Sequence, residues 1–557
     1  MFRLKFFKSI NCRFILLHFL ILLACVLSIT SVIFIIGGRI TNNLFFFEYC
    51  SSLLILYFLF KNKMSKKTFI LNFIISSIIF YILCHISLLF YDFSWDGNVY
   101  HKQMIGLMKN GMNPLYNVNS GDIWTQHYAN GSEIWGAVLY SSFGDIEIGK
   151  CLNLILALCL CIYSYFTIFK ISKSKLFSIL FSICLSFNPV LINQFHSYYI
   201  DGIVADSLFI FILSLINFIL DDFSISDKYT VIVFVTSSIV LINSKFTALL
   251  FWGLFGLVLG GYILLKNIRN KRVNEIKNFI IIGLCTGLFS VLIVGSSTYL
   301  KNTIQHHNPF YPLMGADSVD IETGNEPGLF KKYNHFEKWL YGTFSETYTW
   351  YDTDPKLKIP FSVSSSELYS IKFPDIRIGG LGVWYSGLLC LSVPAILIGF
   401  FYNLRNRKIL NVVSLLLLFA ILVPIPVLPV VWQARYYPEI YLIPFIAAIY
   451  CCCFKGNVFK YYGYLIICAA LINSLFMVPQ AKEKLIDSRT INNQLVELAE
   501  KSLTEKVLIS QDNYTFYGSY YNYLDKGIRY EYSKERLDDG IPFYYGAMYK
   551  IVDEGDK

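Results

Sequence analysis

Long apolar segments recur along the whole chain, and they constrain its fold more than any other feature. A helix needs about 20 mostly apolar residues to cross roughly 30 Å of hydrocarbon, and backbone groups cannot stay unpaired in lipid, so such segments must be helical. Charged residues make up only 15% of the 557 residues, against about 25% in soluble domains. This composition excludes a mainly disordered, coiled-coil or collagen-like chain, and it excludes nucleic-acid binding as the main function. The segments that qualify are 14–37, 44–60, 68–91, 149–169, 176–191, 202–220, 229–243, 246–265, 278–299, 378–402, 409–431, 439–454 and 461–477.

The chain is therefore predicted to be an all-α polytopic membrane protein with about thirteen transmembrane helices, counted from these segments. The short connections that alternate with the N-terminus are rich in Lys and Arg, including Arg3, Lys5, Lys8 and Lys455, whereas those on the other side hold only Arg39, Lys245 and Arg435. The positive-inside rule then places the N-terminus in the cytoplasm and, for an odd number of spans, the C-terminus outside. The first span resembles a lipoprotein signal at "LLAC", but its apolar run continues to Ile36 and favours an uncleaved anchor.

The polar part of the chain is concentrated in three long outer segments. Residues 92–148 and 300–377 interrupt a transmembrane domain over 1–477, and residues 478–557 follow it. The outer loops are expected to hold surface-lying helices and one lid-like segment with Glu346 and Asp352. The sequence of the last segment predicts a helix near 481–503 followed by the strands "KVLISQ", "GIRYEYS" and "AMYKIVDEG". It is predicted to be a small extracytoplasmic α/β domain.

Acidic side chains mark the first two outer connections. Asp92 and Asp96 are four residues apart in "YDFSWDGNVYH", so they share a face if the preceding helix continues. A carboxylate beside a Trp at a low-dielectric edge tends to hold its proton, which suits a general base. Asp201 begins a span and Asp206 lies one turn inside it. Interaction with the helix dipole is the alternative for Asp201, whereas an intramembrane acid usually faces a cavity.

Two cations stand out against the charge bias of the outer side. Lys245 sits in a tight turn between two spans, and Arg435 lies in "WQARYYPEIYLIP" between Trp432 and Tyr436. An arginine fork matches a phosphate bidentately, and neighbouring aromatic rings suit an isoprenoid or a sugar face. The alternative is an interfacial aromatic belt with side chains that reach the lipid headgroups.

Four motifs together resemble the GT-C fold glycosyltransferases, in particular bacterial members related to protein mannosyltransferases and the aminoarabinose transferases of lipid A. They are "SWDGNVYH" followed by "GMNPLY", then "NPVLINQFHSYYIDG", "KNTIQHHNPFYPL" and "WQARYYPEIYLIP". The resemblance covers roughly residues 60–450. Many members carry a paired acid in the first loop, whereas Asp96 here is followed by Gly97 and Asn98. One carboxylate is a poor divalent site, so metal dependence is in doubt and no other cofactor is indicated.

The resemblance implies an inverting glycosyltransferase that moves a sugar from a polyprenyl-phosphate carrier to a glycan, lipid or protein acceptor. The reaction takes place at the outer face of a bacterial inner membrane and involves no nucleic acid. Asp96 is then the general base, and the residues expected to hold the donor phosphate are Arg435, Lys245 and Tyr436. The residues expected to position the substrates are Asp92, Tyr100, His101, His196, Asp201, His307 and Trp432.

Two other functions fit parts of the sequence. A polysaccharide polymerase or ligase of the O-antigen type also uses prenyl-linked glycans, but it is expected to rely on several outer arginines, and only Arg377 and Arg435 stand near the outer face between spans nine and twelve. A lipid-linked sugar transporter or flippase often shows internal repeats and midplane charges, whereas the sequence shows no repeat and its acids gather at one face. The sugar, the acceptor and the oligomeric state are not determined by any motif.

Overall fold

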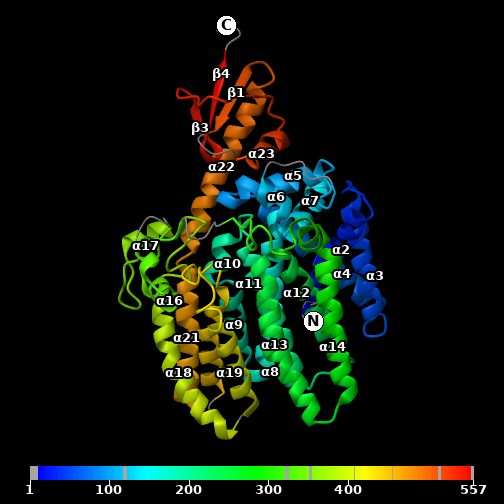
Figure 1. Cartoon of the computed structure of the whole chain (residues 1–557), viewed down its shortest axis with the longest axis vertical. Coiled ribbons are helices and arrows are strands. Elements are labelled where there is room, and N and C mark those ends of the chain that lie inside the picture. The colour runs from blue at the N-terminus through cyan, green and yellow to red at the C-terminus, as the bar shows by residue number, and fades with distance from the viewer. Residues whose placement is uncertain are drawn as a thin grey trace, which may run out of the picture.

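The computed structural model describes residues 11–116, 122–319, 325–349, 354–406, 408–453, 456–511 and 516–552. Among the residues used above, Arg3, Lys5, Lys8, Asp352 and Lys455 lie outside these ranges. The described part is a bundle of long helices that carries a small sheet at one end (Figure 1). An α-helix lies in each apolar segment that the sequence singles out, with these bounds: α2 Cys12–Ile35, α3 Leu44–Phe60, α4 Lys66–Leu88, α8 Cys151–Ser172, α9 Lys175–Ser186, α11 Asp201–Leu220, α12 Lys228–Ser244, α13 Phe246–Arg269, α14 Val273–Phe289, α18 Tyr385–Asn406, α19 Lys408–Leu422, α20 Leu442–Cys452 and α21 Asn457–Leu475.

The length and composition of these helices confirm a polytopic helical membrane protein. In the described residues, 7 helical segments are long and apolar enough to cross a membrane. They are Cys12–Ile35, Lys66–Leu88, Ile146–Ser172, Asp201–Leu220, Phe246–Arg269, Val273–Val294 and Asn457–Lys501. The other segments that the sequence singles out contain shorter apolar helices of 10–17 residues. The number of membrane crossings therefore stays a prediction.

Two predicted spans are wrong at the end nearest the polar loops. The segment 409–431 is helical only to Leu422, because Pro424, Pro426 and Pro429 follow and a proline removes the helical N–H and crowds the preceding turn. The segment 378–402 becomes helical only at Tyr385. Non-helical backbone at both places is thus free to line a cavity.

The first long outer segment begins where α4 stops. The helix ends at Leu88, and Tyr91–Ser94 has no helical structure, so the helix does not continue and Asp92 and Asp96 do not share a helix face. A π-helical turn, Gly97–His101, leads into α5 Lys102–Lys109, followed by α6 Ile123–His127, α7 Gly131–Phe143 and a 3-10 turn Ile146–Lys150. The apolar face of α5 packs against α7, and Ile105 and Met108 are fully buried.

The remaining short elements surround the same end of the bundle. Two of them begin with a capping box that satisfies free N–H groups at the helix start: α16 with Asn334 and Glu337, and α17 with Ser364 and Glu367. Their bounds are α16 His335–Phe344 and α17 Ser365–Ser370. The others are α10 Pro189–Gln194, α15 Lys301–His306, π-helical turns Ser290–Val294 and Ser296–Leu300, and 3-10 turns Phe330–Lys332 and Pro438–Tyr441.

The C-terminal segment forms a small α/β unit with its own apolar core (Figure 1). Helix α22 Val478–Lys501 leads to β1 Lys506–Gln511, α23 Ser519–Asp525, β2 Glu531–Tyr532, β3 Ile541–Phe543 and β4 Ala547–Val552. The sheet has the order β2-β1-β4-β3; β1 pairs antiparallel with β4, with Leu508 opposite Lys550. The predicted helix and strands are present, although the strand predicted in "GIRYEYS" covers only Glu531–Tyr532, and β3 is an addition. Tyr91 from the first outer segment packs into this core, so the unit is anchored on the loop that carries Asp96.

Candidate active site

Five connections between the long helices meet around one cavity of about 540 Å³. Charged groups from segments far apart in the sequence face it, together with a wall of Trp and Tyr rings. The residues that line it are Trp95, Asp96, Val99, Tyr100, Trp124, Tyr128, Tyr199, Ile200, Asp201, Lys245, Thr247, Leu313, Asn325, Asp375, Arg377, Leu428, Pro429, Val430, Arg435 and Tyr436. Its size lies within the range of small-molecule sites, about 300–1,000 Å³.

Arg435 is the central charge of the cavity. Its guanidinium is 10% exposed and lies among three carboxylates, with Nη1 3.5 Å from Asp96 Oδ2 and 3.7 Å from Asp201 Oδ2, and Nε 3.4 Å from Asp375 Oδ1. The rings of Tyr199 and Tyr436 cover it, with their centroids 4.8 and 4.7 Å from Cζ. These contacts hold the guanidinium plane while leaving it at the cavity wall.

Lys245 is the second cation, and it comes from the link between α12 and α13. Its extended backbone, with φ −160° and ψ 151°, separates the two helices. Its Nζ lies 2.5 Å from Asp201 Oδ1 and 3.9 Å from the ring centroid of Tyr436. Asp201 also accepts a hydrogen bond from Gln194 Nε2 at 3.2 Å. Asp201 therefore connects both cations of the cavity.

The charges around the cavity change the proton affinity of both cations. Burial opposes the charge of Arg435, but Asp375, Asp201 and Asp96 outweigh it and raise its pKa well above the usual value. For Lys245, burial prevails over the attraction of Asp201 and lowers its pKa. Arg435 is hence a permanent positive charge, whereas burial makes the charged form of Lys245 less favourable than it is in water.

Aromatic residues build the opposite wall. Tyr100, Trp124 and Tyr128 pack together, with the rings of Trp124 and Tyr128 at 84° and 5.7 Å. Burial, reinforced by the charge of Asp96, raises the pKa of Tyr100 and of Tyr128 well above that of a free phenol. Both phenols stay protonated at neutral pH and can donate hydrogen bonds. A wall of rings with polar edges suits the apolar face and the hydroxyls of a sugar.

Asp96 owes its place at the cavity to a tightly bonded loop. Asp92 is fully buried and accepts hydrogen bonds from the backbone N–H of Ser94 at 2.8 Å and of Tyr198 at 3.2 Å. Asn98 Nδ2 donates to the carbonyl oxygens of Asp92 and Ser94 at 2.8 and 2.9 Å. A Cβ at Gly97 would lie 1.8 Å from Asp92 Oδ2, so only glycine allows this approach. The loop leaves the Asp96 carboxylate 25% exposed.

The C-terminal unit holds the same loop from the other side. Tyr544 donates its hydroxyl proton to the carbonyl oxygen of Asp92 at 2.7 Å and accepts from Lys102 Nζ at 2.6 Å. Lys102 Nζ also bonds Glu147 at 2.7 Å and Asn522 at 3.0 Å. The N–H of Gly518 donates to the carbonyl oxygen of Asn98 at 2.8 Å, and Phe516 packs edge-on against Trp95. The position of Asp96 thus depends on residues more than 400 positions later.

The structure brings six of the residues named from the sequence to this cavity: Asp96, Tyr100, Asp201, Lys245, Arg435 and Tyr436. Five others do not line it. Asp92 is the buried anchor of the loop. The ring of His101 bonds Glu133, and His196 stacks on Phe90 with centroids 3.5 Å apart. His307 is exposed in a left-handed turn with φ +54°, and Trp432 faces elsewhere.

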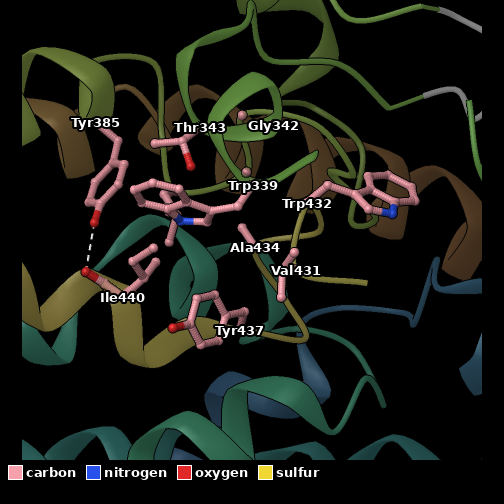
Figure 2. Close-up of a pocket in the computed structure, with 12 residues that line it drawn as sticks. Trp339, Gly342, Thr343, Tyr385, Val431, Trp432, Ala434, Tyr437 and Ile440 are labelled. Carbon is pink, nitrogen blue, oxygen red and sulfur yellow. Dashed lines mark hydrogen bonds between the residues drawn. The ribbon is translucent and has the colours of Figure 1, made fainter. Parts of the chain in front are cut away.

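Trp432 illustrates why sequence neighbours of Arg435 need not share its site. Its ring packs with Phe330, at 5.3 Å between centroids, and with Ile378. Figure 2 shows this ring turned away from Ala434 and Tyr437, which border a separate void. That void measures about 10 Å³, which is space for one water molecule. Trp432 therefore supports the backbone of the turn and has no access to the large cavity.

The sequence reasoning missed Asp375 as a site residue. It lies in "FPDIR", directly after α17, where Arg377 Nη2 binds its Oδ2 at 3.0 Å while its Oδ1 faces Arg435. An acid and an arginine two positions apart in an outer loop are a usable signal.

Asp206 was the acid that the sequence placed one turn inside a span. It is fully buried, and neither of its carboxylate oxygens has a hydrogen-bond partner among the described residues. Within those residues, no group of three or more His, Cys, Asp and Glu side chains is arranged to hold a metal ion.

Comparison with known proteins yields two similar solved structures. No family model matches the sequence, and no curated protein matches it. The crystal structure of ArnT from Cupriavidus metallidurans bound to undecaprenyl phosphate superposes with a TM-score of 0.45 and 11% identity, over 84% of this chain and 86% of that chain. The apo state of the same protein gives a TM-score of 0.44 and 10% identity, over 80% and 84% of the two chains. The chain is thus similar to these structures along most of its length, at low identity.

Proposed function

We propose that this protein is an inverting glycosyltransferase that moves a sugar from a polyprenyl-phosphate carrier to an acceptor at the outer face of a bacterial inner membrane. The observation that carries the proposal is the shared cavity, in which the carboxylate of Asp96 faces two buried cations, Arg435 and Lys245, beside an aromatic wall. The four sequence motifs that resemble GT-C enzymes support the same reaction. The sugar and the acceptor are left open.

The cations are the binding site for the donor phosphate. Arg435 Nη1 now contacts Asp96 and Asp201 at 3.5 and 3.7 Å, distances longer than a strong charge-assisted hydrogen bond. A phosphate oxygen can take the place of Asp96 at this nitrogen and make a shorter contact. Lys245 lies on the other side of Asp201 and would complete the binding of a second oxygen. An incoming anion also stabilises the charged form of Lys245, whose pKa burial lowers.

Asp96 is the group that accepts the acceptor's proton. As the acceptor oxygen attacks the anomeric carbon, its O–H proton passes to the Asp96 carboxylate, and the bond from that carbon to the phosphate oxygen breaks. The electron pair leaves with the polyprenyl phosphate, whose increased negative charge Arg435 and Lys245 stabilise. In-line attack inverts the anomeric centre. It also requires the sugar to lie between Asp96 and the cations, so the ion pair at 3.5 Å must separate when the donor binds.

The test is a comparison of surface glycans in cells that lack the gene with cells that carry it. Mass analysis should show the loss of one sugar substituent, restored by the wild-type chain and not by Asp96→Asn. Asp538→Asn is the matched control, because Asp538 is exposed and belongs to the C-terminal unit. Restoration by Asp96→Asn at equal protein level in the membrane would remove Asp96 from the mechanism.

The same experiment separates the competing functions. A polymerase or ligase changes the number of whole repeat units rather than one sugar. A transporter with no chemistry at this cavity supports equal transport with Asp96→Asn and with Arg435→Gln. Either result contradicts the proposed transfer of a single sugar.

A further inference from the structure

A second, separate binding feature lies on the side of the bundle formed by α2, α3 and α12. An apolar groove of about 430 Å³ runs between these helices and continues into a basic cavity of about 200 Å³. Ile232 lines both. The groove is lined by Ile21, Ala24, Cys25, Ser28, Ile29, Ser51, Ile55, Val231, Ile232, Val235, Thr236 and Ile239. The basic cavity is lined by Asn11, Arg13, Leu17, Leu59, Phe60, Lys63, Met64, Lys228, Tyr229 and Ile232.

The two cavities form one continuous furrow. On α2 the lining residues recur at helical spacing, from Arg13 through Leu17 and Ile21 to Ser28. Helix α2 packs against both α3 and α12 and forms the floor of the furrow. From Leu17 to Ser28 the rise of an α-helix gives roughly 16 Å. That is about half of the 30 Å hydrocarbon thickness of a bilayer, so the furrow has the length of one leaflet.

The open end of the furrow carries three cations, and no ion pair joins any of them to a carboxylate of the described residues. Arg13, Lys63 and Lys228 line it and form no ion pair there, and no acid is among the lining residues. Two other cations of the bundle are paired: Lys170 with Asp221, and Lys266 with Asp222 at 2.5 Å. Arg13, Lys63 and Lys228 therefore stand together around one cavity and are available to an anionic group.

A polar group also faces this end without a partner. The hydroxyl of Tyr229 is buried and has no hydrogen-bond partner among the described residues. The guanidinium of Arg13 lies over the ring of Tyr229 at 5.2 Å and over that of Phe166 at 4.9 Å. One phenol donor and one oriented guanidinium therefore sit beside two lysines at the mouth of an apolar groove.

We propose that this furrow binds an anionic phospholipid, with the phosphodiester at Arg13, Lys63, Lys228 and Tyr229 and one acyl chain along α2. Basic pockets between membrane helices are suited to acidic headgroups, and the groove length matches a lipid of a single leaflet. The site is distinct from the candidate active site, because Lys228 and Lys245 stand at opposite ends of α12. The lipid seals α2 and α3 to the bundle at the end remote from the cavity.

The test uses the full chain, purified in a non-ionic detergent and examined by native mass spectrometry with phosphatidylglycerol or phosphatidylcholine of identical acyl chains. The wild type should retain one phosphatidylglycerol in preference to phosphatidylcholine. The triple variant Arg13→Gln, Lys63→Gln, Lys228→Gln should lose this retention about tenfold or more. The control Lys170→Gln, Lys266→Gln, Arg272→Gln removes three paired cations and should keep it.

Several outcomes would overturn the proposal. Equal retention of both lipids, or equal loss in the control variant, shows that no selective site exists. Displacement of the lipid by millimolar glycerol phosphate alone shows a site for a free phosphate. Ala24→Trp fills the groove, so undiminished retention by this variant excludes the acyl chain from it. If the triple variant does not fold, Lys63→Gln alone, at an exposed position, decides the outcome by losing or keeping the preference.

Discussion

Replacing Asp96 by Asn should separate donor binding from sugar transfer. The Asp96 carboxylate lies 3.5 Å from Nη1 of Arg435 and is 25% exposed, so in the empty site it competes with the donor phosphate for that cation. Ion pairs of this exposure contribute about 0.2–1 kcal/mol. Without the competing charge, a prenyl phosphate should bind up to about fivefold more tightly. Transfer should fall by about 10²–10⁴-fold, because no base is left to take the acceptor's proton.

The assay titrates a short prenyl phosphate such as farnesyl phosphate into the purified chain and measures turnover on the same samples. Arg435→Gln is the opposite perturbation: losing a charge-assisted contact of about 1.5–3 kcal/mol should weaken binding by about 10–150-fold. Asp538→Asn should leave both quantities unchanged. If Asp96→Asn weakens farnesyl phosphate binding as much as Arg435→Gln does, Asp96 holds the donor and is not a base, and the reasoning is refuted.

Three further predictions concern stability. Burial raises the pKa of Asp525 from 3.8 to about 6, so its stabilising contribution is complete below pH 3.8 and is lost as pH rises through about 6. Asp525→Asn should therefore flatten the wild type's fall in Tm between about pH 4 and pH 6. A Cβ at Gly518 would lie 2.7 Å from the carbonyl oxygen of Asn98, so Gly518→Ala should detach the C-terminal unit and speed its limited proteolysis; an unchanged cleavage rate contradicts the contact. Lys245→Met should lower the free energy of unfolding by about 3 kcal/mol, because it leaves Asp201 buried with a weakened set of partners. The double variant with Asp201→Asn should recover much of the lost Tm. A double variant that is no more stable than Lys245→Met excludes the coupling between the two residues.

The apolar pattern predicted a helix in each apolar segment because membrane insertion is a property of local composition. A segment such as Phe246–Arg269 needs no partner to be helical in lipid, since its backbone can satisfy itself only within the segment. The predicted ends were less reliable. Pro424, Pro426 and Pro429 were counted within an apolar run, although each of them disfavours the helix. Hydropathy records the affinity of side chains for lipid and ignores the missing N–H.

The candidate site was predicted where a residue's chemistry was unusual for its position. Arg435 and Lys245 broke the charge bias of their side, and both line the cavity. The histidines were chosen because they lie in the motifs that carry the resemblance, and His101 and His196 are instead buried against Glu133 and Phe90. Residue type indicates which reactions a side chain can perform, whereas its partners decide whether it is free to perform them.

The amino-acid sequence by itself determined that the chain crosses a membrane many times and which cations stand against its charge bias, because hydropathy and charge act residue by residue. Only the tertiary structure decided that Asp96, Asp201, Asp375 and Arg435 surround one cavity. It also decided that Asp92 supports the loop and that Tyr544 fixes it from the C-terminal unit. These assignments depend on contacts between segments up to about 450 residues apart, and no local pattern encodes which of many polar residues will meet when the helices pack.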